Sequence, residues 1–412
     1  MKSANQSIRE YAKQYAELAR SPAQDEKRRL WRRLNSFHFE KPLIYMRSVP
    51  YYEFFDFSVV KNEDPFLNGI ERNLATVVLY QQKLKDDFIF EPWVKVNAVF
   101  SLPGVNRWGV PCGMGEKPKD HGAAAFKPPI VTEEDLAKVQ PAESIIDEKA
   151  TAERIEKAQD AIGNILDVVP DRQGLFSCMW NRDISTDLAK LRGLEQFMWD
   201  IYDRPEWLHR LIALMRDTVL KDIEKTEQEG NFRRYNNENQ AMSYCEELPV
   251  PDASLTGRKT RELWGFMASQ EFTGVGPDLY EEFMLNYQMP IMERFGMIAY
   301  GCCEDMTAKI PVLRKIKNLR RVAITPFSDV RKCAEQIGKD YVVSYRPNPS
   351  SMIANGLDED LVRGILKRDF EILKENHCII DVTLKDVETI AGKPENMIRW
   401  VEIVRQMGEE IF

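Results

Sequence analysis

Histidine is scarce in this chain of 412 residues, and positive charge is outnumbered by negative charge. Only four histidines occur, at positions 38, 121, 209 and 377, and their scatter excludes a histidine-rich metal site. Lys and Arg total 57 against 65 Asp and Glu, a net charge of −8, which argues against a nucleic-acid-binding protein because such proteins carry a basic patch. No run approaches the roughly 18–20 apolar residues of a membrane-spanning helix. The start, MKSANQSIREYAKQYAELARS, lacks the apolar stretch of a signal peptide, so we expect a cytoplasmic protein that binds neither nucleic acid nor membrane.

Cysteine is present, but without the spacing of a structural metal site. The chain has seven cysteines, an odd number, and no CxxC pair. An odd number of thiols without an export signal indicates a reducing compartment and free thiols. Together with the scarcity of histidine, this means that any bound metal is held by thiolate and carboxylate groups.

The last third of the chain alternates between apolar strands and amphipathic helices. Its predicted strands are residues 297–303, 320–325, 340–347 and 378–384. Short connections between a strand, a helix and the next strand imply parallel strands with right-handed crossovers, and continuously apolar strands imply that both faces of the sheet are covered. The pattern is compatible with a barrel or an open doubly wound sheet. Because neither GxGxxG after a first strand nor GxxxxGK[ST] occurs, the barrel is favoured.

Segments before residue 297 supply the remaining strands of the predicted barrel. Candidate strands at 42–49, 94–100, 165–171 and 231–237 bring the number of strands to eight. The predicted fold class is therefore an α/β protein with a TIM (β/α)8 barrel. Residues 1–40 add N-terminal helices, and the Gly- and Pro-rich residues 102–130 add a long, lid-like loop.

Active sites of such barrels lie at the carboxyl ends of the strands. The segment after the 297–303 strand places Cys302 and Glu304 on one face, because side chains alternate along a strand. Zinc accepts thiolate and carboxylate ligands. Cys303 is adjacent, and Asp386 or Glu388 on a neighbouring strand end supplies a further ligand. The alternative is that both cysteines are small core residues, as free cysteines often are.

Other polar residues near predicted strand ends are candidates for catalysis or binding. Glu271 is a candidate general base, or a partner in a salt bridge. Asn237 and Glu238 belong to a polar cluster at 236–239 that either contacts substrate or forms a turn. Arg346 either binds a carboxylate with its guanidinium group or caps a loop.

A longer segment carries a resemblance to a known family. The block LWGFMASQEFTGVGPDLYEEFMLNYQMPIMERFGMIAYGCCED, followed by IPVLRKIKNLRRVAITPFSDVRKCAEQIGKDYVVSYRPNPS, resembles the uroporphyrinogen decarboxylase superfamily, and within it the branch of corrinoid-dependent methyltransferases. The resemblance covers residues 160–410 well and the first 130 residues loosely, and it implies a single TIM-barrel domain over residues 1–412. The Arg-Gln-Ala-Gly-Arg segment with which true decarboxylases of this superfamily bind a porphyrinogen is missing from PLIYMRSVPYYEF, which argues against a role in porphyrin synthesis.

The resemblance also implies a metal site. The methyltransferase branch holds zinc with a His-x-Cys pair, which falls on Tyr300-Gly301-Cys302, and with a later Cys, which falls within LKDVETIAG. Only Cys302 matches by identity. The implied zinc is therefore held by Cys302 or Cys303 with Glu304 and Asp386, or it is absent.

The implied activity is transfer of a methyl group between a small ether, amine or thiol and the cobalt of a separate corrinoid protein. The chain lacks the Asp-x-His-x-x-Gly motif of cobalamin-carrying modules. A homodimer is a further expected assembly. The alternatives are a cofactor-independent decarboxylase of an organic acid and a non-catalytic docking protein. The residues expected to act are Glu271 and Asn237 in catalysis, Glu238, Arg346 and Tyr300 in substrate binding, and Cys302, Cys303, Glu304 and Asp386 in metal binding.

Overall fold

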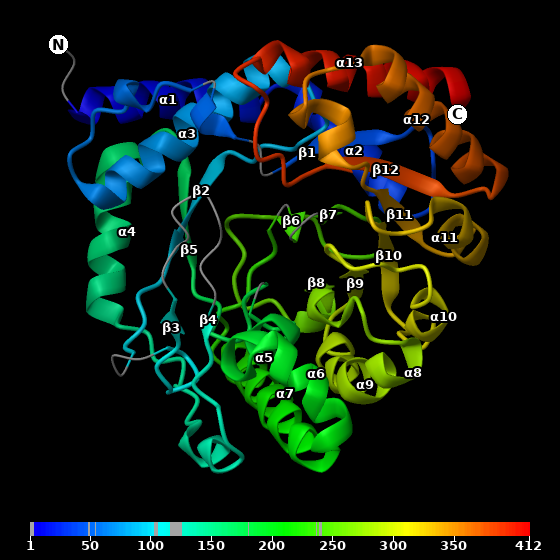
Figure 1. Ribbon diagram of the computed structural model, residues 1–412. Helices are drawn as coiled ribbons and strands as arrows, with labels where there is room; N and C mark the ends of the chain where they lie inside the picture. Colours follow the sequence, from blue (N-terminus) through cyan, green and yellow to red (C-terminus); the bar gives the residue numbers. More distant parts are fainter. Residues whose placement is uncertain are drawn as a thin grey trace.

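Eight parallel strands form the frame of the part of the chain that the structure describes, and six of them make one curled sheet (Figure 1). The computed structural model describes residues 4–47, 50–53, 55–102, 106–115, 126–179, 181–235, 237–238 and 241–412. The six-stranded sheet has the order β1-β12-β11-β10-β9-β8, and β2 pairs with β5 in a separate parallel ladder. These parallel strands are β1 (Leu43–Met46), β2 (Trp93–Asn97), β5 (Asp167–Asp171), β8 (Trp264–Met267), β9 (Met297–Tyr300), β10 (Leu319–Ile324), β11 (Val342–Tyr345) and β12 (Ile379–Leu384).

The predicted closed barrel is present only in part. Within the described ranges, no ladder joins β5 to β8 or β1 to β2, so the eight strands form two ladders and not one closed ring. The strand predicted at 231–237 is wrong, because residues 231–235 have no strand partner and the remaining parallel strand is β8. The physical reason lies in the side chains. Strand β8 is apolar and buried at every position, whereas Arg233 and Arg234 follow each other in the other segment.

Helices follow most of the strands. Their bounds are α1 (Ala4–Ala19), α2 (Pro22–Asn35), α3 (Pro65–Leu84), α4 (Glu148–Ile162), α5 (Ser185–Arg192), α6 (Leu194–Asp203), α7 (Pro205–Gln228), α8 (Pro277–Tyr280), α9 (Asn286–Met292), α10 (Ile310–Leu313), α11 (Val330–Ile337), α12 (Glu359–Glu375) and α13 (Pro394–Ile411). Aspartates begin four of them, since Asp64, Asp147, Asp329 and Asp358 each accept a hydrogen bond from a first-turn backbone N–H. None of the described helices is long and apolar enough to cross a membrane.

Two charged segments form only short helices. The segment AKIPVLRKIKNL forms the one-turn helix α10, and the segment TEEDLAKVQ forms a 3-10 helix at Glu134–Lys138. In the second segment the Asp135 carboxylate accepts hydrogen bonds from the N–H groups of Val131 and Thr132, which closes the turn before the helix.

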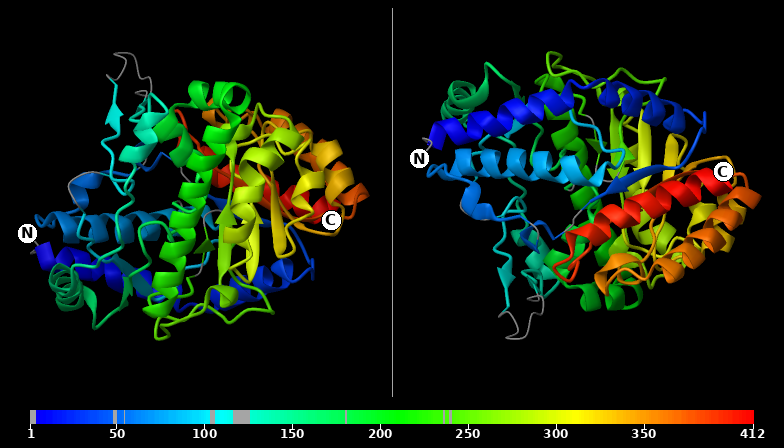
Figure 2. Two further views of the ribbon diagram at one scale, coloured as in Figure 1. Left: turned by 90° about the horizontal axis from the view of Figure 1, so that it is seen from below. Right: turned by 90° about the horizontal axis from the view of Figure 1, so that it is seen from above.

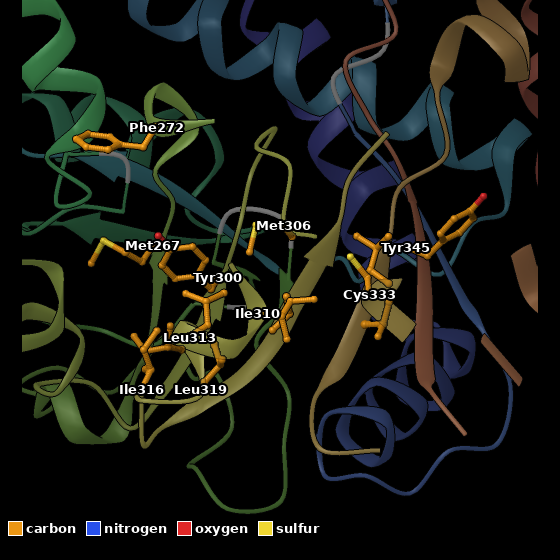
Figure 3. Packing of buried hydrophobic residues seen from close by; sticks show 14 of the residues in the cluster. Met267, Phe272, Tyr300, Met306, Ile310, Leu313, Ile316, Leu319, Cys333 and Tyr345 are labelled. Atoms are coloured by element: carbon orange, nitrogen blue, oxygen red, sulfur yellow. The ribbon is translucent and has the colours of Figure 1, made fainter. Parts of the chain in front are cut away.

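The two faces of the six-stranded sheet differ in their contacts. On β9, Ile298 and Tyr300 belong to the large apolar cluster that contains the covering helices, whereas Met297 and Ala299 belong to a smaller cluster on the other, inner face. Figure 3 shows Tyr300 in the large cluster, beside Met267 of β8. The inner face leads to the carboxyl edge of the sheet, where Cys302 joins the smaller cluster.

The ladder of β2 and β5 has an apolar core of its own. Ala12 of α1, Leu74 of α3 and Ala158 of α4 pack with Val96 of β2. Figure 2 shows α1 and α3 side by side at one end of the molecule. Two short antiparallel pairs complete the strands, β3 (Gly113–Met114) with β4 (Phe126–Lys127) and β6 (Asn237–Glu238) with β7 (Ala241–Met242).

Candidate functional site

The carboxyl edge of the six-stranded sheet presents two adjacent thiols. Strand β9 ends at Tyr300, and Gly301 then turns the chain with a φ of 106°, a conformation that favours glycine. A Cβ atom at Gly301 would lie 2.9 Å from the Cβ of Ala323 on β10, so the turn packs closely on the neighbouring strand. This turn places Cys302 and Cys303 next to the end of β12.

Lys385, the residue directly after β12, lies between the two thiols. We call Cys302, Cys303, Lys385 and Asp386 the thiol–lysine cluster. The Lys385 Nζ is 3.4 Å from the Cys302 Sγ, 3.2 Å from the Cys303 Sγ and 2.9 Å from the Asp386 Oδ2. Cys302 and Lys385 are buried, whereas the Asp386 side chain is 55% exposed, so the cluster opens to solvent beside Asp386. The sequence analysis missed Lys385, although its place between a buried strand and Asp386 was a usable signal.

The two thiols differ in acidity. The hydrogen bond with Cys303, together with the positive charges of Lys385 and Arg346, outweighs burial and lowers the pKa of Cys302 to about 6. The same hydrogen bond, together with burial, raises the pKa of Cys303. At neutral pH Cys302 is therefore the thiolate and Cys303 the neutral thiol that donates to it. The thiolate is the nucleophilic form of cysteine.

We expect iodoacetamide to modify Cys302 before the other buried cysteines, with a rate that rises through a midpoint near pH 6. A cysteine with an ordinary pKa of about 8.5 is only about 3% ionised at neutral pH. Cys333 and Cys378 are internal controls, since burial raises the pKa of each to about 12. Lys385→Met should slow alkylation of Cys302 at neutral pH by about tenfold, because a nearby cation favours the thiolate. Peptide mass spectrometry over a pH series measures the rates, and equal labelling of Cys302 and Cys333 would contradict the assignment.

Glu304 does not join the thiol–lysine cluster. Its side chain is fully buried, and its two carboxylate oxygens accept hydrogen bonds from the backbone N–H groups of Ser269 and Cys302, each at 2.8 Å. Glu304 thus ties the end of β8 to the turn after β9. It positions the backbone of Cys302.

Tyr300 and Arg346, both predicted to bind substrate, are also buried. The Tyr300 hydroxyl lies 2.5 Å from the Tyr280 hydroxyl and 2.9 Å from the Ser269 Oγ, on the helix-covered side of the sheet. Arg346 donates from Nη1 to the carbonyl oxygens of Gly301 at 3.2 Å and Cys302 at 2.6 Å. Arg346 thus supports the thiol-bearing turn, whereas the Tyr300 hydroxyl is held on the opposite side of the sheet.

The donor groups of the cluster do not fit a zinc ion as they lie. Among the described residues no three His, Cys, Asp or Glu side chains are grouped so that they could hold a metal. The Lys385 ammonium lies where an ion shared by Cys302, Cys303 and Asp386 would have to lie, and Glu304 is turned toward backbone N–H groups. A thiolate next to an ammonium group already has its positive partner.

A second polar group surrounds Glu271, the predicted general base. Ser185 and Thr186 donate hydroxyl hydrogen bonds to its carboxylate at 2.7 and 2.9 Å. Asp183, which the sequence analysis missed, is buried nearby, and burial followed by the charge of Glu271 raises its pKa well above the usual value. Ile184 between these segments has a φ of 54°, which is uncommon for a β-branched residue. The group thus combines an acid whose pKa is raised with a hydrogen-bonded carboxylate, an arrangement suited to proton transfer.

Asn237 lies apart from both groups. It begins the short strand β6 and lines a cavity together with Tyr15, Trp93 and Lys95, near α1 and β2. The structure does not describe the side chain of Glu238. Residues 236, 239 and 240 lie outside the described residues, so the predicted polar cluster at 236–239 stays a prediction.

The predicted lid is described only at its two ends. Trp108 is buried and donates from Nε1 to Asp187 at 2.6 Å, and Phe126 is 44% exposed on β4. Residues 103–105 and 116–125 lie outside the described residues. A closing motion of this loop therefore stays a prediction.

Comparisons with known proteins do not assign the chain to a family. No protein-family model matches the chain, and no curated protein sequence matches it. Of the solved structures, a methyltransferase from Methanosarcina mazei superposes with a TM-score of 0.47 and 10% sequence identity, over 90% of this chain and 94% of that one. A likeness of this size identifies neither a family nor an activity.

Proposed function

We propose that the protein transfers a methyl group from a small methylated ether, amine or thiol to the cobalt of a separate corrinoid protein, with Cys302 as the nucleophile. The observation that carries the proposal is the position of the Lys385 Nζ, 3.4 Å from Cys302 and 3.2 Å from Cys303 at the carboxyl edge of a parallel sheet. Parallel α/β enzymes hold their reacting groups at that edge. The resemblance of residues 263–305 to the methyltransferase branch supports the same activity.

The thiol–lysine cluster supplies both the nucleophile and the proton donors that this methyl transfer needs. The Cys302 thiolate attacks the methyl carbon, so that a sulfur–carbon bond forms while the bond from carbon to the substrate's oxygen, nitrogen or sulfur breaks. The leaving atom takes up a proton, for which the Lys385 ammonium and the Cys303 thiol are the adjacent donors. The methyl group is then passed to Co(I), and Cys302 leaves as the thiolate that Lys385 stabilises.

Zinc has no part in this sequence of steps. Its binding to Cys302, Cys303 and Asp386 stays a prediction, which elemental analysis of the purified protein checks. If the protein holds about one zinc per chain and the Cys302→Ala variant holds none, zinc binds at Cys302. In that case the Lys385 side chain must move away from the thiols when the metal binds.

One observation favours the alternative of a cofactor-independent decarboxylase. Decarboxylation leaves a carbanion that must be protonated, and the raised pKa of Asp183 makes it a proton donor beside Glu271. Against this alternative, Arg346 donates to backbone carbonyl oxygens of the thiol-bearing turn, so the predicted grip on a substrate carboxylate has no support from its contacts.

The experiment that tests the proposal uses free cob(I)alamin as the methyl acceptor. Wild-type protein is incubated anaerobically with 2-methoxyphenol, trimethylamine or dimethyl sulfide, and the absorption spectrum reports conversion of cob(I)alamin to methylcobalamin. Mass spectrometry of the Cys302 peptide, without acceptor, tests for the methylated cysteine. Release of carbon dioxide from added organic acids, with no methyl transfer from any donor, would favour the decarboxylase. No turnover of either kind by a folded protein would leave the docking role.

A further inference from the structure

A narrow cavity between strands β5 and β8 is lined by three arginines. It lies beside residues 231–235, where the predicted strand is missing. Its lining includes Arg182, Arg233, Arg234, Tyr235, Ser243 and Trp264. Of the described residues that line it, none is acidic. A chain with a net charge of −8 thus contains a small, strongly positive hollow.

Arg234 is the central cation of this cavity. It is 3% exposed and donates from Nη1 to the carbonyl oxygen of Glu262 at 2.9 Å and from Nη2 to that of Ser243. Its Nε has no hydrogen-bond partner, and no described carboxylate forms an ion pair with its guanidinium. Burial lowers the pKa of Arg234, although the Cys245 thiol, 3.8 Å from the Arg234 Nη2, acts in the opposite direction.

Two more donors from other segments reach the same cavity. The indole Nε1 of Trp264, at the start of β8, is buried without an acceptor, and an indole N–H can only donate. Arg182, 1% exposed, donates to the Ser177 carbonyl oxygen at 2.9 Å and lies 4.4 Å over the ring of Phe295. Burial lowers the pKa of Arg182 to about 10.

A carboxylate close to Tyr235 of the cavity is already paired, because Asp171, at the end of β5, lies 3.1 Å from Lys95. Arg234 and Trp264 therefore bring to the cavity a charged and a neutral donor whose Nε and Nε1 atoms have no acceptor among the described residues. Guanidinium groups bind carboxylate and phosphate oxygens through parallel N–H donors, which is the chemistry that this set of groups offers.

We propose that this cavity binds a small oxyanion, a carboxylate or phosphate group, between Arg182, Arg234 and the indole N–H of Trp264. The site is independent of the proposed methyl transfer, since it contains no residue of the thiol–lysine cluster. Its small size limits the bound part to a group of a few heavy atoms. The ligand is either a free inorganic anion or the charged end of a larger molecule.

Isothermal titration of the full-length protein with inorganic phosphate and with acetate, at constant ionic strength, tests the proposal. Wild type should bind at least one of the two anions, and Arg234→Met should weaken that binding by about 10- to 100-fold, because a charge-assisted hydrogen bond is lost. Binding of acetate alone identifies the ligand as a carboxylate, and binding of phosphate alone identifies it as a phosphate group.

Two further variants distinguish a specific loss of anion binding from a loss caused by misfolding. Trp264→Phe keeps the ring and removes only the N–H, and it should weaken binding by about three- to tenfold. Arg331→Met removes a positive charge from the surface, where the Arg331 side chain is 52% exposed, and should leave binding unchanged. The proposal is overturned if wild type binds neither anion, or if Arg234→Met and Trp264→Phe both bind as wild type does.

Discussion

Cys302→Ser should lower the rate of methyl transfer to cob(I)alamin by about 10³-fold or more, the size of effect seen when an enzyme loses its nucleophile. Serine keeps the shape of the side chain, but its hydroxyl does not ionise near neutral pH, so Lys385 no longer has a thiolate to stabilise. The initial rate at saturating methyl donor, followed by the absorption of methylcobalamin, is the measurement.

Cys303→Ser is the matched control for this prediction. The variant changes the adjacent residue in the same turn and keeps a hydroxyl donor to Cys302, so the rate should fall by about tenfold or less. A Cys302→Ser protein that retains most of the wild-type rate, or a Cys303→Ser protein with the larger loss, would show that Cys302 is not the nucleophile.

Asp381→Ala should destabilise the protein by about 3–5 kcal/mol, because it leaves a buried guanidinium without its partner. On the inner face of the sheet, Arg321 of β10 donates to Asp381 of β12, and both side chains are almost completely buried. Asp381 also accepts from the Thr383 hydroxyl at 2.8 Å, and Arg321 also donates to the Asn35 side chain at 2.6 Å. Urea unfolding followed by circular dichroism gives the free energy of unfolding.

The control for Asp381→Ala is the double variant Arg321→Met/Asp381→Leu. Replacing both charges by apolar groups of similar size removes the uncompensated charge, so the double variant should be more stable than Asp381→Ala. If Asp381→Ala costs no more than about 1 kcal/mol, the typical value for an exposed ion pair, the buried pair does not have the expected role.

The strands after residue 297 were predictable because each is an apolar run followed by a charged helix. The predicted segments 320–325 and 378–384 match β10 and β12 to within one residue. Strand β8 was not predicted because its four residues, WGFM, are too few to show a periodic pattern. The polar residues that follow it are typical of a loop. Closure of the ring was not predictable from strand count, since hydrogen bonds between β5 and β8 depend on how Arg233 and Arg234 are accommodated.

The position of the candidate site in the fold was predictable from the sequence, but the set of residues that forms it was not. Cys302, Cys303 and Asp386 do lie together, although β10 and β11 separate β9 from β12 in the sheet, because the carboxyl ends of all these parallel strands lie at one edge of a curled sheet. The role of Glu304 was not predictable from alternation along the strand, since the left-handed turn at Gly301 breaks that alternation. The sequence position of Lys385, directly before Asp386, marked it as a candidate, but its contact with both thiols depends on how far its side chain reaches across the edge.

The pairing of β1 with β12 constrains how the protein is made. Leu43–Met46 pair in register with residues 381–384, so the edge strand β1 is synthesised long before its neighbour β12. During synthesis the N–H and C=O groups of β1 on that side have no strand to pair with until β12 has been made. Unpaired apolar strand edges promote aggregation of nascent chains. A chain that stops before β12 therefore loses more than its last strand and helix, since the ladder that anchors Leu43–Met46 is lost with them.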